Sequence, residues 1–124
     1  ILMGQGESTY QPLKTYLLRG VACQGTEYAD SSEGTKARKV LFDCMDTNKD
    51  GAIDKKEIPH MWKQFNLAYK SMAKELQTKD KKLTKDSFYQ MLHYYDTEGD
   101  GDGSINYEEF SCLLQEVLDR VRPQ

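Results

Sequence analysis

The chain has 124 residues, of which 38% are hydrophobic and 30% are charged, so it is long enough for one buried core, too short for two independent ones, and too apolar to be wholly disordered. Its net charge of -3, together with the lack of a basic, aromatic pattern, argues against nucleic acid as a partner. No stretch approaches the roughly 20 apolar residues that cross a bilayer, and no secretion signal is recognisable, so we expect a cytoplasmic protein.

The beginning of the chain contains no loop with acidic residues at metal-binding spacing, and we treat residues 1–35 as a leader to a main unit at residues 36–124. Pro12 is a suitable first residue for a short helix in this leader, and Gly20 is a suitable end. Apolar residues on one side of that helix are Leu13, Tyr16, Leu17 and Val21. Residues 24–35 are rich in Gly, Ser and acids, which indicates a flexible connector. Either the helix packs its apolar side against the main unit, or the leader is disordered.

Acidic residues are concentrated in two short windows, the first being the segment DTNKDGAIDKKE at residues 46–57. Carboxylates this close repel one another, and Ca²⁺, a hard ion that takes about six to eight oxygen ligands, would hold them together. Gly51 permits the sharp turn that the backbone makes around such an ion. The predicted ligands are Asp46, Asn48, Asp50, the carbonyl of Ala52, Asp54 and Glu57.

Helices are predicted on both sides of this loop, because apolar residues recur about one helical turn apart. They are Leu41, Phe42 and Met45 before the loop, and Ile58, Met61, Trp62 and Phe65 after it. The alternative is a solvated turn between two helices, which is common where only some ligand positions match. Every defining position is filled here, and we therefore predict an ion site.

A long connection separates the two acidic windows, from Phe65 to Thr84. Further apolar residues indicate that the helix after the first loop continues past Phe65: Leu67, Tyr69, Met72 and Leu76. Four lysines fit a solvated linker better than a recognition patch: Lys79, Lys81, Lys82 and Lys85. Thr84 is a suitable N-cap for a helix at residues 86–95.

The second acidic window ends at Glu109 and admits two registers. Counting back from Gly103 gives a loop at residues 98–109. Its ligands would be Glu98, Asp100, Asp102, the carbonyl of Ser104, Asn106 and Glu109. The apolar residues of the preceding helix are instead phased as if the loop began at Asp96, two residues earlier. In either register we expect the weaker of two sites, because three glycines add backbone freedom that binding must freeze.

The two loops with their flanking helices resemble the EF-hand superfamily over residues 37–121, with calmodulin-like and calexcitin-like or sarcoplasmic calcium-binding proteins as the nearest types. The resemblance implies an all-α fold of paired EF-hands and reversible binding of two Ca²⁺ ions, with Mg²⁺ as a competitor and no catalysis. In such a pair, Ile53 and Ile105 are expected to lie opposite each other in a short β-ribbon.

The leading functional hypothesis is a monomeric calcium sensor that opens an apolar groove for an amphipathic target helix. Methionines would make the groove adaptable, although core packing explains the same residues: Met45, Met61, Met72 and Met91. The alternatives are a calcium buffer and the regulatory part of a longer protein. No nucleophile or phosphate-binding loop indicates an enzyme.

Two remaining features bear on compartment. Cys23, Cys44 and Cys112 lack the spacing of a disulfide framework, so we expect reduced thiols, with the last two in the core. The segment at residues 3–8 matches the Met-Gly-x-x-x-Ser signal for myristoylation, and Gly4 would then direct the chain to membranes. That holds only if Met3 is the native start, and a chance match is the favoured alternative.

Overall fold

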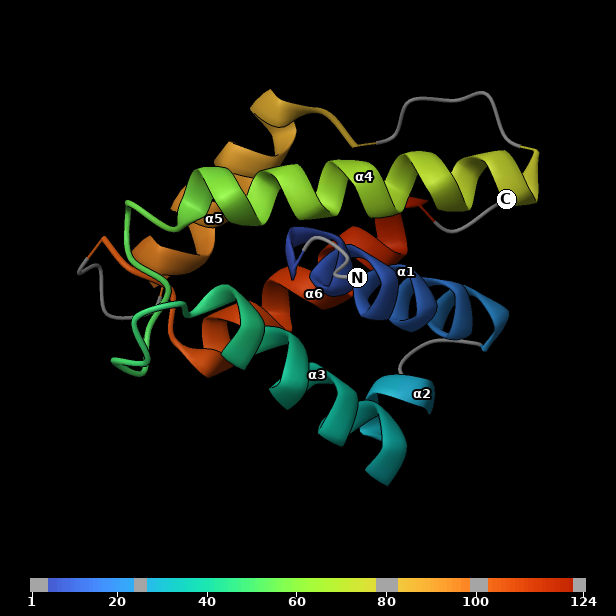
Figure 1. The fold of residues 1–124 in the computed structure, drawn as a ribbon, viewed down its shortest axis with the longest axis horizontal. Helices are drawn as coiled ribbons and strands as arrows, with labels where there is room; N and C mark the ends of the chain where they lie inside the picture. The colour runs from blue at the N-terminus through green and yellow to red at the C-terminus, as the bar shows by residue number, and fades with distance from the viewer. Residues whose placement is uncertain (1–4, 24–26, 78–82, 99–102, 122–124) are drawn as a thin grey trace.

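The computed structural model describes residues 5–23, 27–77, 83–98 and 103–121, with the backbone alone at residues 5–9, 97 and 98, and the statements below refer to this part of the chain. Six helices account for most of it (Figure 1): α1 (Gln5–Ala22), α2 (Glu27–Asp30), α3 (Ser32–Met45), α4 (Ile58–Leu76), α5 (Lys85–Glu98) and α6 (Tyr107–Val121). The predicted all-α fold is confirmed. None of these helices is long and apolar enough to cross a membrane.

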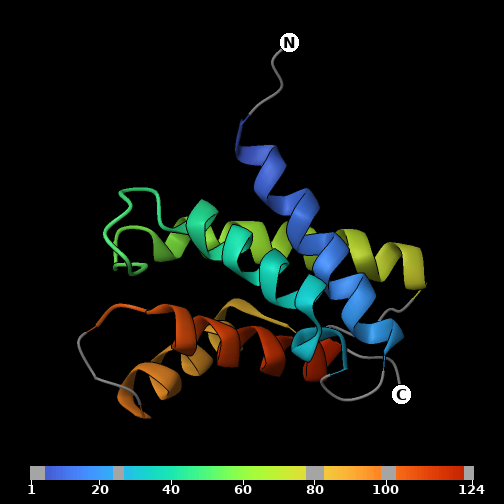
Figure 2. The same cartoon turned by 90° about the horizontal axis from the view of Figure 1, so that it is seen from below.

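Helices α3 to α6 form two helix–loop–helix units whose loops meet at one end of the molecule (Figure 2). An antiparallel bridge joins the loops, with two N–H···O bonds of 2.8 Å between Ile53 and Ile105. The expected pairing of these isoleucines is present as a single bridge, and the described residues show no longer ribbon around it.

The core lies between the apolar faces of the four paired helices and α1. Its largest fully buried side chains are Tyr16, Phe65, Phe88, Phe110, Leu13, Leu17, Leu41, Met45, Ile53, Met61, Met72 and Ile105. Phe42 of α3 packs on Phe110 of α6 with ring centroids 5.6 Å apart, and Phe65 of α4 packs on Phe88 of α5 at 5.0 Å. The methionines that a sensor groove would use are all buried. In this structure they fill the core.

Helix α1 is longer than the leader helix that the sequence indicates. It begins at Gln5 and contains Pro12, so this proline lies inside the helix and does not open it. A proline there removes one backbone hydrogen bond, and tertiary contacts must offset the loss. Such contacts include an ion pair from Lys14 to Glu75 of α4 and two bonds of 2.6 and 2.7 Å from Arg19 to Glu33 of α3.

The apolar side of α1 faces the paired helices. Figure 1 shows α1 between α3 and α4 and next to α6, and its most extensive contacts are with α4. Leu13, Tyr16 and Leu17 are at most 1% exposed and belong to the same core as the paired helices. Arg38 of α3 donates to the Tyr16 hydroxyl at 3.2 Å and to the Ala29 carbonyl at 2.7 Å, which ties α1, α2 and α3 together.

The expected flexible connector differs from the structure where it is described. Residues 27–30 form α2, and α3 begins at Ser32, four residues before the unit expected at 36. Ser31 caps α3 by accepting a 2.9 Å bond from the Gly34 amide. Gly34 is required because a Cβ there would lie 2.0 Å from the carbonyl oxygen of Tyr28. Ser31 and Gly34 therefore form a capped, closely packed turn between α2 and α3.

The long connection is organised largely as expected. Helix α4 continues past Phe65 to Leu76, and Lys79, Lys81 and Lys82 lie outside the described residues. Thr84 caps α5, since its Oγ1 accepts from the Ser87 amide at 3.1 Å and its own amide donates to Ser87 Oγ at 3.0 Å.

Candidate metal-binding loops

The first loop brings three carboxylates together at the end of α3 and the start of α4. Oxygens of Asp46, Asp50 and Glu57 lie within 4.8 Å of one another. Asp46 is only 3% exposed and Glu57 only 6%. Negative charges this close and this poorly hydrated repel one another unless a cation lies between them, and oxygen-only donors suit a hard ion such as Ca²⁺.

Backbone amides fix these carboxylates in place. The Gly51 amide donates to Asp46 Oδ2 at 2.9 Å, and Gly51 has a φ of 92°, which favours glycine. The Asp54 amide donates to Glu57 Oε1 at 2.9 Å, and the Glu57 amide donates back to Asp54 Oδ1 at 3.1 Å. The first and last predicted ligands are thus held by the loop's own backbone.

The described part of the second loop repeats this pattern of bonds. The Asn106 amide donates to Glu109 Oε1 at 3.0 Å, and the Glu109 amide donates to Asn106 Oδ1 at 2.8 Å. Gly103 has a φ of 83°, and its amide donates to Asp96 Oδ2 at 3.0 Å. Asp96 therefore makes the bond that Asp46 makes in the first loop.

Asp100 and Asp102 and the side chain of Glu98 lie outside the described residues. The backbone of α5 continues through Asp96 to Glu98, whereas α3 ends at Met45, immediately before Asp46. Because of this difference, Asp96 and Gly103 are separated by two residues more than Asp46 and Gly51 in the first loop.

Asp96 also carries an atom that lacks a partner. Its Oδ1 is buried, and among the described residues nothing donates a hydrogen bond to it. A buried carboxylate oxygen without a donor is costly in free energy, and a cation on that side would remove the cost. Asp96 of the second loop thus fits a metal ion, on a different ground from the three converging carboxylates of the first loop.

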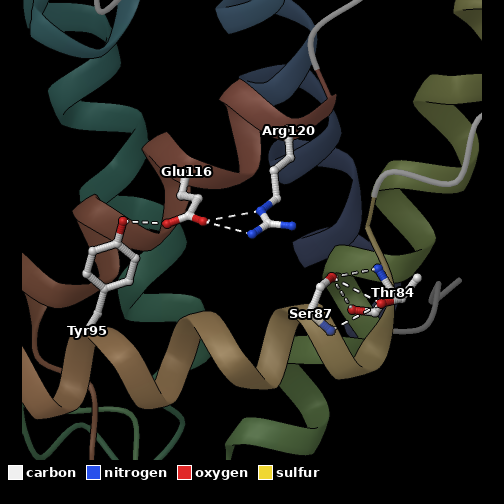
Figure 3. A network of polar contacts seen from close by, with 5 residues as sticks. All are labelled: Thr84, Ser87, Tyr95, Glu116 and Arg120. Atoms are coloured by element: carbon white, nitrogen blue, oxygen red, sulfur yellow. Dashed lines mark hydrogen bonds and ion pairs between the residues drawn. The ribbon is translucent and has the colours of Figure 1, made fainter.

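A polar network that the sequence did not reveal joins α5 to α6 beside the second loop (Figure 3). The Tyr95 hydroxyl donates to Glu116 Oε1 at 2.6 Å, and Glu116 also accepts from Arg120 at 3.1 and 3.2 Å. Burial and the neighbouring Glu116 carboxylate raise the pKa of Tyr95 well above its ordinary value. The four-residue spacing of Glu116 and Arg120 was the available sequence signal for part of this network.

The cysteines are unpaired, and the two that were expected in the core are not among its buried residues. Cys44 is half-buried, and Cys112 is exposed on α6. The buried apolar face of α6 is formed by other residues, including Leu113, Leu114 and Val117, which are fully buried.

Two calcium-type loops, bridged back to back and flanked by four packed helices, define a paired EF-hand protein. Residues 35–115 match the family of the EF-hand domain pair, so the chain belongs to the EF-hand superfamily of calcium-binding proteins. It is 34% identical over 76 residues to a probable calcium-binding protein, CML13, from rice (Oryza sativa subsp. japonica). The match covers 61% of this chain and 36% of that relative, so the chain spans about a third of the relative's length. No solved structure matches the chain significantly.

Proposed function

We propose that this chain binds two Ca²⁺ ions reversibly, one in each loop, and carries out no catalysis. The observation that carries the proposal is the convergence of Asp46, Asp50 and Glu57 within 4.8 Å. The rice relative is named as a probable calcium-binding protein, which supports the same function. In the first loop the proposed ligands are those expected from sequence: Asp46, Asn48, Asp50, the Ala52 carbonyl, Asp54 and Glu57.

For the second loop we propose the longer register, a loop from Asp96 to Glu109 with Asp96 as first ligand. The support is the bond from the Gly103 amide to Asp96, which matches the bond from Gly51 to Asp46 in length and role. The other proposed ligands are Asp100, Asp102, the Ser104 carbonyl, Asn106 and Glu109. Glu98 then becomes an additional residue of the loop and no longer its first ligand.

Titration calorimetry with Ca²⁺, in the presence and absence of Mg²⁺, tests both sites. We expect two ions of unequal affinity. Glu57→Gln should abolish the tighter phase and Glu109→Gln the weaker one, since each removes the carboxylate that closes its loop. A single ion in the unmodified chain, or two in Glu109→Gln, would contradict the second site.

A matched pair of variants distinguishes the two registers. Asp96→Asn and Glu98→Gln each remove one negative charge, two residues apart. With Asp96 as ligand, only Asp96→Asn should weaken the second phase strongly. The reverse ranking would restore the shorter loop.

We propose further that the protein acts as a calcium sensor. The surface that an EF-hand pair would offer to an amphipathic target helix is covered here by α1, through Leu13, Tyr16 and Leu17. Ca²⁺ would therefore act by loosening α1 from α3 and α4, and the target would take its place. The alternative is a buffer in which α1 stays docked. A fluorescent apolar dye should bind more strongly after Ca²⁺ addition to the whole chain in the sensor, and equally in the buffer.

A further inference from the structure

The pairing of the two loops places a lysine of the first loop beside the second. Ile53 and Ile105 form an antiparallel bridge, so the residue two positions after Ile53 lies across from the residue two positions before Ile105. These residues are Lys55 and Gly103. The corresponding partner of Gly51, on the other side of the bridge, is the uncharged Tyr107.

Close contact accompanies this pairing. Cε of Lys55 lies 3.2 Å, and its Nζ 3.8 Å, from the place that a Cβ would take on Gly103. A Cβ on Gly51 would meet nothing within 4 Å. The lysine stem therefore lies over the backbone of the second loop, and the first loop has no equivalent cation in that position.

Lys55 also shares a pocket with Asp96, the residue proposed to begin the second loop. Lys55, Gly103 and Asp96 line one cavity between the start of α4 and the end of α5. Gly103 is the residue whose amide holds Asp96. None of the ion pairs among the described residues involves Lys55.

We propose that Lys55 sets the affinity of the second loop for Ca²⁺, its positive charge opposing a divalent ion held by Asp96 and Glu109. Lys55 is not one of the proposed ligands of the second loop and acts through the electrostatic potential at that loop. This inference rests on the proposed binding of calcium in the second loop. The difference in calcium affinity between the two sites then has two causes: the positive charge that the first loop places beside the second, and the greater length of the second loop.

Calcium titration of the whole chain at low ionic strength tests the role of Lys55. Lys55→Gln keeps much of the side-chain length and removes the charge, and it should tighten the weaker phase about three- to tenfold. Lys55→Arg keeps the charge and should leave that phase as it is. Lys74→Gln is the matched control, because it changes the net charge equally from the far end of α4, about 24 Å along the helix from its start.

The salt dependence of calcium affinity distinguishes an effect of the Lys55 charge from an effect of its side-chain shape. The gain in Lys55→Gln should shrink toward nothing near 1 M KCl, where the screening length falls to about 3 Å. In a Glu109→Gln background, the remaining first-loop phase should change less on adding Lys55→Gln than the weaker phase does in the unmodified chain, since the lysine stem lies over the backbone of the second loop.

Three results would overturn the role of Lys55: an unchanged weaker phase in Lys55→Gln, the same change in Lys55→Arg, or a gain that persists at high salt. Failure of the proposed function would look different. The unmodified chain would then show one ion only, and Lys55 would have no second site on which to act.

Discussion

Gly20 of α1 lies against Leu118 of α6, and it offers a direct test of how α1 docks. A Cβ at residue 20 would lie 2.5 Å from Cδ2 and 2.8 Å from Cδ1 of Leu118. Leu118 is only 1% exposed, so its methyl groups have little room to move aside. Gly20→Ala therefore has two opposing effects on stability.

The magnitudes decide the sign. Overfilling a packed core costs about 1–3 kcal/mol, whereas replacing glycine by alanine inside a helix contributes about 0.5–1 kcal/mol. We expect a net loss of about 0.5–2 kcal/mol in the unmodified chain. Leu118→Ala alone should cost about 2–5 kcal/mol by leaving a cavity. In that background the clash is gone, and Gly20→Ala should stabilise by about 0.5–1 kcal/mol.

Urea unfolding followed by far-ultraviolet circular dichroism, in excess chelator, gives the four free energies of this double-mutant cycle. The reasoning requires the effect of Gly20→Ala to reverse sign between the two backgrounds. A stabilising effect of similar size in both would mean that α1 does not pack against Leu118 in solution.

Three further outcomes follow from the structure. Ca²⁺ at a hundredfold excess over its Kd should stabilise the fold by about 2.7 kcal/mol per site, and an equal melting temperature in chelator would contradict this. Tyr95→Phe should cost about 1–2 kcal/mol below pH 10 by removing the bond to Glu116. Because folding raises the pKa of Tyr95, the contribution of Tyr95 to the free energy of unfolding is complete below the unfolded pKa of about 10 and is lost as pH rises through the folded pKa. The difference in stability between Tyr95→Phe and the unmodified chain should therefore shrink in alkali, as denaturant titrations up to pH 12 would show. Ser31→Ala should cost about 1 kcal/mol by removing the cap on the Gly34 amide, whereas Ser32→Ala, one residue on, should cost little.

The local features of this fold were readable from sequence because each is specified within a few residues. The spacing of the acidic residues in 46–57 and the cap at Thr84 depend on short-range geometry, whereas the pairing of Ile53 with Ile105 joins distant parts of the chain and was expected from the resemblance to paired EF-hands. The register of the second loop was not readable, since it depends on how far α5 continues. A single bond, from Gly103 to Asp96, favours one of the two alternatives.

The features that sequence misjudged are those fixed by distant contacts. Pro12 is a good helix start by local criteria, yet α1 extends seven residues before it, and α1 packs on α4 and α3. Gly34 and Ser31 suggested flexibility by composition, although the structure uses them for a close backbone approach and a cap. Composition does not distinguish a loose glycine from one that a neighbouring carbonyl requires.

The docking of α1 also limits how calcium can act. To shift α1 from 99% docked to 99% released, two ions together must favour the released state by about 5.5 kcal/mol, or roughly a hundredfold difference in affinity per ion. Such coupling is reciprocal, so whatever weakens docking must strengthen calcium binding. Gly20→Ala is the suitable perturbation, because it lies in α1, outside both loops. In a sensor it should tighten calcium binding by up to about tenfold for each 1.4 kcal/mol of docking lost, whereas Lys74→Gln should not. An unchanged calcium titration in a Gly20→Ala protein that is measurably destabilised would mean that α1 and the loops are uncoupled, and the protein would then be a buffer.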